Sequence, residues 1–281
     1  MKNIQYIKIF DTVKNMCIDA ACTLPEDVLA RIERARRSEP FPRAQAILDQ
    51  IIENAAIAND KRVPICQDTG TAVFFVKLGD DVRVEGGTLA DAINEGTRAG
   101  YTDGYLRGSI VSDPIFDRKN TLDNTPASIH IDLTKGDMLE ITLLPKGGGC
   151  ENMSALGMLK PSDGLRGVMD FVRDTVVNAG GNPCPPVVVG IGVGGTADAA
   201  CVLAKKALLR PLGEYHNDNR YAQLEKELLN EINASGVGPQ GLGGKHTALW
   251  VSVEHAPCHI ASMPVAVSIN CHVSRKVSVV F

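Results

Sequence analysis

Three prolines enclose a cysteine in the segment Asn182–Pro186, and this stretch restricts the fold more than any other in the chain. Proline has no N–H to donate and fixes its own φ angle, so the segment must be extended and poor in backbone hydrogen bonds. The run Val187–Gly195 behind it is β-branched and then glycine-rich. That order predicts a strand buried on both faces, a tight turn and a helix from Thr196.

Composition excludes several classes of function. The 281 residues are 44% hydrophobic and 22% charged, which is ordinary for a globular enzyme. The formal net charge is -4 and the lysines are scattered, so no basic stripe marks a nucleic-acid or membrane partner. The N-terminus has no signal-peptide pattern and no apolar window is long enough to span a bilayer. We therefore expect a cytoplasmic protein.

Hydrophobic periodicity predicts an α/β fold of mixed sheets flanked by helices, as one domain over residues 1–281. Helical patterns fill residues 4–58, and we expect a β-hairpin of residues 128–133 and 138–144. The last residues, Val277–Phe281, form an apolar run that looks exposed. Further elements are predicted as helices at 89–101, 164–179, 197–209 and 221–234, and as strands at 71–78, 248–253 and 265–269.

A Rossmann fold is not expected. The glycines at 190, 192 and 194 follow a strand but lack the full dinucleotide fingerprint, and no second half of such a fold is visible. A nucleotide-dependent enzyme that uses the two glycine-rich loops is the weaker alternative, and it requires no iron.

Eight cysteines without a signal peptide indicate reduced thiols, and no C-x-x-C pair suggests structural zinc. Cys66, Cys184 and Cys271 share one context, because each lies where a strand meets a loop punctuated by proline or glycine. Three loop cysteines are one short of a closed Cys₄ cluster site, which leaves one metal position open for substrate. Three other cysteines lie in helical patterns, and we predict that they are buried: Cys17, Cys22 and Cys201.

Two neighbouring motifs add polar groups. Asp68 follows Cys66 and Gln67 directly, and its carboxylate either binds local backbone in a turn or serves a site. Arg107 is close to glycine on both sides, so its guanidinium can meet a substrate carboxylate or stay a solvated surface charge. The loop Gly147–Gly149 offers backbone N–H donors to an anion.

Five motifs in this order resemble the class I iron-sulfur fumarate hydratases, and the likeness runs over most of the chain from about residue 25. The motifs are Cys66–Gly70, Gly147–Asn152, Asn182–Pro186, Gly238–Gly244 and Asn270–His272. The resemblance implies that three cysteines hold a 4Fe-4S cluster whose open iron binds the substrate. The residues it implies are Cys66, Cys184 and Cys271 as ligands, Gln67, Arg107 and Gly149 for substrate, and Asp68 and His259 for proton transfer.

The resemblance leads us to expect the α subunit of an enzyme that interconverts fumarate and (S)-malate. Glu151–Ser154 and Gly243–Lys245 are fumarase-like, whereas Cys150 stands where fumarate hydratases more often have serine and L-tartrate dehydratases can have cysteine. An L-tartrate dehydratase α subunit is therefore the alternative, and a non-catalytic cluster-carrying subunit is the second.

No candidate base for the substrate C–H stands out in the sequence. The family's long form supplies that base from a second domain, so we expect a separate β subunit of the swivelling-domain type. The resemblance also implies a homodimer of αβ units.

Overall fold

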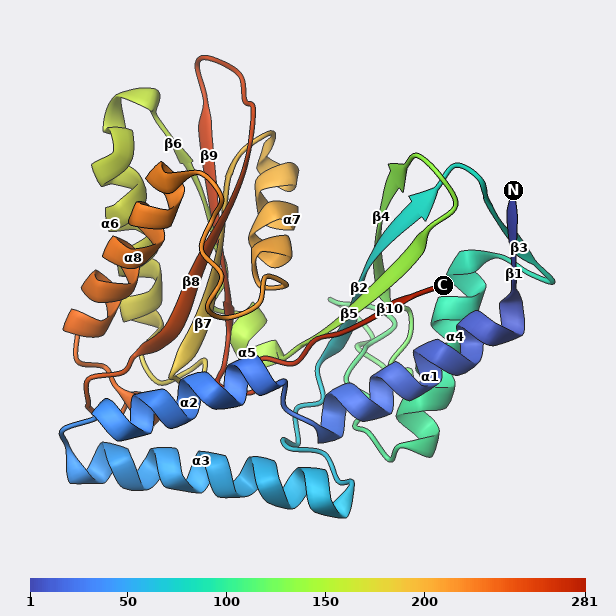
Figure 1. The fold of residues 1–281 in the computed structure, drawn as a ribbon, viewed down its shortest axis with the longest axis horizontal. Helices are drawn as coiled ribbons and strands as arrows, with labels where there is room; N and C mark the ends of the chain where they lie inside the picture. Colours follow the sequence, from blue (N-terminus) through green and yellow to red (C-terminus); the bar gives the residue numbers. More distant parts are fainter. The chain divides into compact units, whose positions relative to one another are not determined.

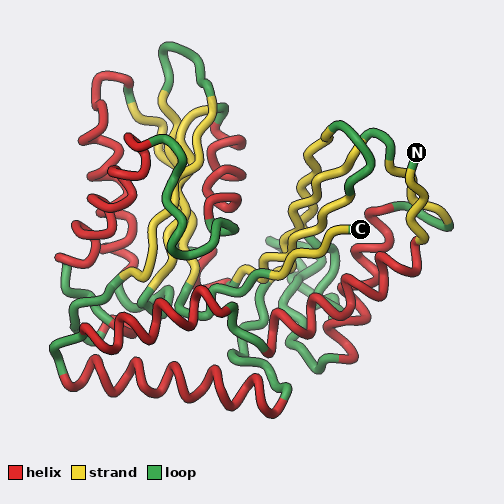
Figure 2. Tube along the Cα trace, in the orientation of Figure 1, coloured by secondary structure: helices red, strands yellow, loops and turns green.

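The computed structural model describes residues 1–281, and the chain divides into two compact units. The first contains Met1–Leu24, Ala55–Gly148 and Arg275–Phe281, and the second contains Pro25–Asn54 and Gly149–Ser274. Each unit has its own mixed four-stranded sheet covered by helices (Figures 1 and 2), so the predicted α/β class is confirmed. The single domain predicted over residues 1–281 stays a prediction.

The sheet of the first unit has the order β10-β5-β2-β4. Strand β2 (Thr71–Gly79) pairs in parallel with β4 (Ser128–Thr134) and antiparallel with β5 (Leu139–Lys146). The predicted hairpin of β4 and β5 is therefore wrong, because β2 lies between them. The reason is burial: β2 is the apolar strand and takes the centre, whereas β4 is half-exposed and takes the edge.

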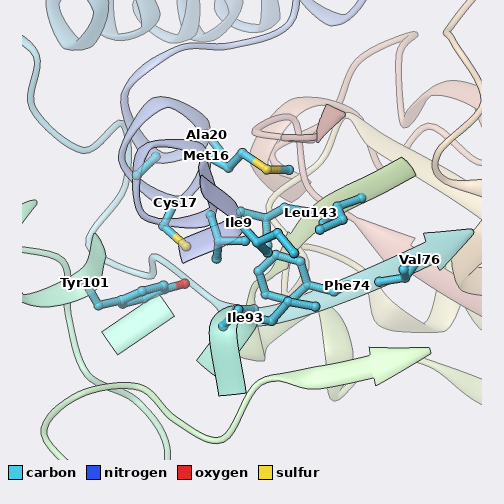
Figure 3. Packing of buried hydrophobic residues seen from close by; sticks show 14 of the residues in the cluster. Ile9, Met16, Cys17, Ala20, Phe74, Val76, Ile93, Tyr101 and Leu143 are labelled. Atoms are coloured by element: carbon cyan, nitrogen blue, oxygen red, sulfur yellow. The ribbon is translucent and has the colours of Figure 1, made fainter. Parts of the chain in front are cut away.

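Helices α1 (Tyr6–Cys22) and α4 (Leu89–Asp103) build the core of this unit against β2 and β5. Figure 3 shows Ile9 and Cys17 of α1 facing Phe74 of β2. Strand β10 (Val277–Val280) pairs antiparallel with β5, and Val277, Val279 and Phe281 pack on the same core. The terminal run thus packs one side on its own unit, whereas Ser278 and Val280 are exposed on this edge strand, so the expectation of an exposed run is confirmed in part. A small parallel sheet is formed by β1 (Lys2–Gln5) and β3 (Val82–Glu85).

The second unit has the sheet order β6-β9-β7-β8, with β7 parallel to β8 and antiparallel to β9. Helices α6 and α8 cover one face with apolar side chains, and α7 covers the other (Figure 1). The bounds are β6 (Ala155–Leu159), α6 (Gly164–Ala179), β7 (Val187–Gly194), α7 (Ala197–Ala207), α8 (Asn219–Ala234), β8 (Ala248–Ala256) and β9 (Met263–Asn270).

Helices α1, α2 (Glu26–Ser38) and α3 (Pro42–Lys61) confirm the helical prediction for residues 4–58, except that residues 4 and 5 belong to β1. The remaining helical elements are the short α5 (Gly148–Glu151) and the 3₁₀ turns η1 (Pro161–Asp163) and η2 (Pro239–Gly241). None of the helices combines the length and apolar character that crossing a membrane requires.

The glycines of β7 allow α7 to lie directly on the strand. A Cβ built on Gly192 would lie 2.0 Å from the carbonyl oxygen of Ala200, and one on Gly190 would lie 2.2 Å from that of Ala204. Close helix–strand packing therefore explains these two glycines without a nucleotide. Cys201 lies beside Ala200 and is exposed, so the prediction that it is buried is wrong.

We expect Gly192→Ala to lower the free energy of unfolding by about 3 kcal/mol or more, because the methyl group would meet a main-chain oxygen that cannot move alone. Gly236→Ala in the same unit is the matched control, since nothing lies within 4 Å of its Cβ and only its φ of 71° opposes alanine. That variant should lose about 1–2 kcal/mol. Urea unfolding measures both, and equal losses would contradict the packing argument.

Candidate active site

The loop from Cys66 to Gly70 enters β2 in the first unit and is held by its own backbone. The N–H of Asp68 donates to the Cys66 Sγ over 3.4 Å, and the thiol lies 3.6 Å from the Gln67 Oε1. Cys66 is half-buried and Gln67 is exposed. This N–H holds the sulfur in a fixed position at the start of the loop.

The Asp68 carboxylate binds two backbone N–H groups from different strand ends. Its Oδ1 accepts from Gly70 over 3.1 Å and its Oδ2 accepts from Gly148 over 2.8 Å. The first bond is the local turn that the sequence allowed. The second reaches the predicted glycine loop, so Asp68 links the segment before β2 to the segment after β5.

Three consecutive carbonyls of this loop are bound by side chains. The oxygen of Asp68 accepts from Arg275 Nη2 over 3.0 Å, and the oxygens of Thr69 and Gly70 both accept from the Tyr101 hydroxyl. The Gly70 oxygen also accepts from Asn124 Nδ2 over 3.0 Å. Burial raises the pKa of Tyr101, so its hydroxyl is a proton donor at neutral pH. Sequence reasoning missed these three side chains.

Arg107 lies against the same loop through its backbone. Its carbonyl accepts from the Thr69 hydroxyl over 3.1 Å, while its own side chain is exposed and makes no ion pair. The guanidinium fork is therefore open to a carboxylate. The predicted substrate residues Gln67 and Arg107 thus belong to the same part of the first unit as Cys66 and Asp68.

Cys184 and Cys271 are brought together in the second unit. The carbonyl of Cys184 lies 2.9 Å from His272 Nδ1 and 3.4 Å from the His272 N–H, which follows Cys271 directly. The register of β7 and β9, with Val188 opposite Asn270, fixes this neighbourhood. Cys184 is exposed with a φ of 53°, and Cys271 is half-buried.

The glycine loop that carries Gly149 touches the same proline segment. A Cβ on Gly149 would lie 3.4 Å from the Asn182 oxygen, and the buried Cys150 Sγ lies 3.6 Å from the Pro183 oxygen. Gln240 of the second glycine-rich motif donates from its N–H to the Pro185 oxygen over 2.7 Å. One of the five motifs is thus the segment that contains Cys184, and three others contact this segment.

His259 lies elsewhere. It is exposed on the loop between β8 and β9, at the end of the second unit's sheet opposite to Cys184 and Cys271 (Figure 1). The eight residues of β7 separate the two ends, a span of roughly 25 Å at the usual rise per residue. Within this unit, His259 cannot meet the two cysteines.

The predicted metal ligands are divided between the units, with Cys66 in the first and Cys184 and Cys271 in the second. None of the cysteines forms a disulfide, and the structure groups no three His, Cys, Asp or Glu side chains for a metal ion.

The chain matches the family model described as fumarate hydratase (Fumerase) over residues 10–280. It is 46% identical over 274 residues to the putative L(+)-tartrate dehydratase subunit alpha of Methanocaldococcus jannaschii, which covers 96% of each chain. It is 33% identical over 273 residues to the L(+)-tartrate dehydratase subunit alpha of Escherichia coli K12, covering 96% of this chain and 89% of the relative.

Proposed function

Because the chain belongs to the fumarate hydratase (Fumerase) family, we propose that it is the α subunit of a hydro-lyase acting on a C4 hydroxy-diacid, with L(+)-tartrate as substrate. The names of its relatives carry this proposal, since they favour tartrate over the fumarate and malate pair that the sequence motifs first suggested. Cys150 also favours tartrate, because L-tartrate dehydratases can have cysteine at this position, where fumarate hydratases more often have serine.

Packing explains the two motifs that had favoured fumarate. Glu151 Oε1 accepts from Lys205 Nζ over 2.5 Å, so this glutamate is used in an ion pair within the second unit. A Cβ on Gly244 would lie 2.9 Å from side-chain atoms of Ala44 and Pro239, so this glycine is needed for close approach. Neither motif is therefore an argument about substrate.

We assign the 4Fe-4S cluster to Cys66, Cys184 and Cys271 because their surroundings suit thiolate ligands. The Cys66 sulfur already accepts an N–H, and Cys184 is exposed on a loop. Burial raises the pKa of the Cys17 thiol to about 12, which makes a helical cysteine a poor ligand. When bound, such a cluster supplies an iron without a protein ligand, a Lewis acid for the substrate hydroxyl.

The remaining roles follow from what each group can donate or accept. The open guanidinium of Arg107 suits a substrate carboxylate, the Gly149 N–H and the Gln67 amide can hold further oxygens, and Asp68 is oriented by two N–H groups to pass a proton to the leaving hydroxyl. Loss of water from tartrate gives an enol that tautomerises to oxaloacetate. The base for the C–H proton is assigned to a β subunit of swivelling-domain type, since the relatives are named as alpha subunits.

The position of His259 supports the proposal of a homodimer. His259 lies about one sheet length from Cys184 in its own unit, so it can serve a cluster site only if it comes from a second copy of the chain. We propose that two αβ units exchange this loop, with His259 of one copy placed beside Asp68 of the other.

The substrate is tested by turnover of the cluster-loaded chain with and without its β subunit. We expect L(+)-tartrate to be converted to oxaloacetate by the pair with a higher kcat/KM than (S)-malate, and almost no turnover by this chain alone. A higher kcat/KM for malate would restore the fumarate hydratase assignment. Turnover by the chain alone would show that the base lies within its residues, and no turnover of either diacid by the pair would favour a cluster carrier.

The ligand assignment is tested by alkylation with iodoacetamide and mass spectrometry. In the iron-free chain we expect Cys66, Cys184 and Cys271 to react, and in the reconstituted chain all three to be protected. The exposed Cys258 should react in both forms, and the buried Cys17 in neither. Equal labelling of the three in both forms would disprove the assignment.

Exchange of His259 is tested by co-expressing two differently tagged copies, His259→Asn and Cys184→Ser, with the β subunit. Each variant alone should be nearly inactive. Random dimers of the two should recover about a quarter of the wild-type activity, because half of them are mixed and each mixed dimer has one intact site. No recovery would mean that His259 acts in its own chain, and full activity of His259→Asn would remove its catalytic role.

A further inference from the structure

Arg275 is a buried cation with unused donors. Its side chain is only 2% exposed, its Nη2 donates to the Asp68 carbonyl over 3.0 Å, and its Nε and Nη1 are buried without a hydrogen-bond partner. It makes no ion pair. Arg210 in the second unit shows the usual arrangement, since its guanidinium is paired with Glu225 and Glu254.

A guanidinium removed from water without an anion is strongly unfavourable, and native proteins seldom leave such donors unsatisfied. The hydrogen bonds of the neighbouring side chains go elsewhere and leave the Nε and Nη1 of Arg275 without an acceptor. The Asp68 carboxylate accepts from the N–H groups of Gly70 and Gly148, and the Tyr101 hydroxyl donates to the carbonyls of Thr69 and Gly70. The two unused donors therefore point to a further acceptor that is bound at this loop in the working protein.

The candidate acceptor that the loop itself offers is the sulfur of Cys66. Arg275 holds the carbonyl of Asp68 and the N–H of Asp68 donates to the Cys66 Sγ, so a single residue joins the guanidinium to the sulfur. Three thiolates on a 4Fe-4S core with two positive charges leave a net negative charge. A buried cation beside it would compensate that charge.

We propose that Arg275 is a positioning residue for the cluster: it fixes the Asp68 carbonyl, and its buried positive charge would compensate the negative charge of a cluster held by Cys66. This inference rests on the proposed function, because it needs the cluster. Arg275 follows Cys271 by four residues, so one short segment supplies both a proposed ligand and the compensating charge.

The test compares Arg275→Gln and Arg275→Lys in the reconstituted αβ enzyme. We measure the reduction potential of the cluster by EPR-monitored titration and the lifetime of its absorbance near 400 nm under a chelator. Loss of the positive charge should make the potential of Arg275→Gln more negative and shorten the lifetime several-fold. Arg275→Lys keeps the charge and should keep a potential close to that of the wild type.

Arg98→Gln is the control, since it removes an exposed arginine of the same unit that pairs with Asp123. Its potential and cluster lifetime should not change. Thermal unfolding of the iron-free variants shows whether Arg275→Gln folds. If it does not, Arg275→Lys decides: the proposal holds if its potential stays near the wild-type value while its lifetime shortens, and fails if neither changes.

Unchanged potential and lifetime in a folded, iron-loaded Arg275→Gln would overturn the inference and mean that water satisfies these donors. A raised KM for tartrate at unchanged potential would also overturn it, by assigning the guanidinium to the substrate carboxylate. Both results leave the cluster assignment intact. A wild-type chain that takes up no iron and sulfide would instead refute the proposed function itself.

Discussion

The Asp68 carboxylate holds the N–H groups of Gly70 and Gly148 at once, and the cysteine loop of the first unit depends on this double hydrogen bond. It fixes where β2 begins relative to the end of β5. Gly70 has a φ of 80°, and a Cβ there would lie 2.9 Å from the Lys146 backbone. The loop therefore accepts no side chain at position 70, and Cys66 is held in one place before any cofactor is bound.

The apolar runs of the sequence predicted where the strands lie, but not which strands pair with one another. The apolar runs at β2 and β7 are long, rich in β-branched residues and bounded by proline or glycine, so burial on both faces follows directly. The partner of β4 does not follow, because a turn at residues 135–137 is compatible with a hairpin and equally with a third strand between its arms. The burial of Cys201 was predicted wrongly for a related reason. Cys201 is adjacent to the packed alanines of α7, but neighbouring residues on a helix point in different directions, so its side chain lies outside the packed face.

The sequence predicts only part of the candidate site. Proline and glycine mark the loops around Cys66, Cys184 and Cys271, and their role as ligands stays a prediction. Nothing in the sequence marks Tyr101, Asn124 and Arg275, because they bind main-chain carbonyls, which every residue type has. The only available signal for Arg275 was its closeness to Cys271 in the chain. The place of His259 depends on strand register, which periodicity alone does not give.

The environment of Cys150 limits how this position can influence the choice of substrate. The side chain is buried and its sulfur faces the Pro183 carbonyl, so it offers no group to a diacid. A serine hydroxyl is a stronger donor than a thiol and would hold that carbonyl more tightly. Any selectivity that originates at position 150 must therefore pass through the segment Asn182–Pro186, by changing where Cys184 and the neighbouring Gly149 N–H are held. The same prolines that keep this segment free of regular structure make it rigid enough to transmit such a shift.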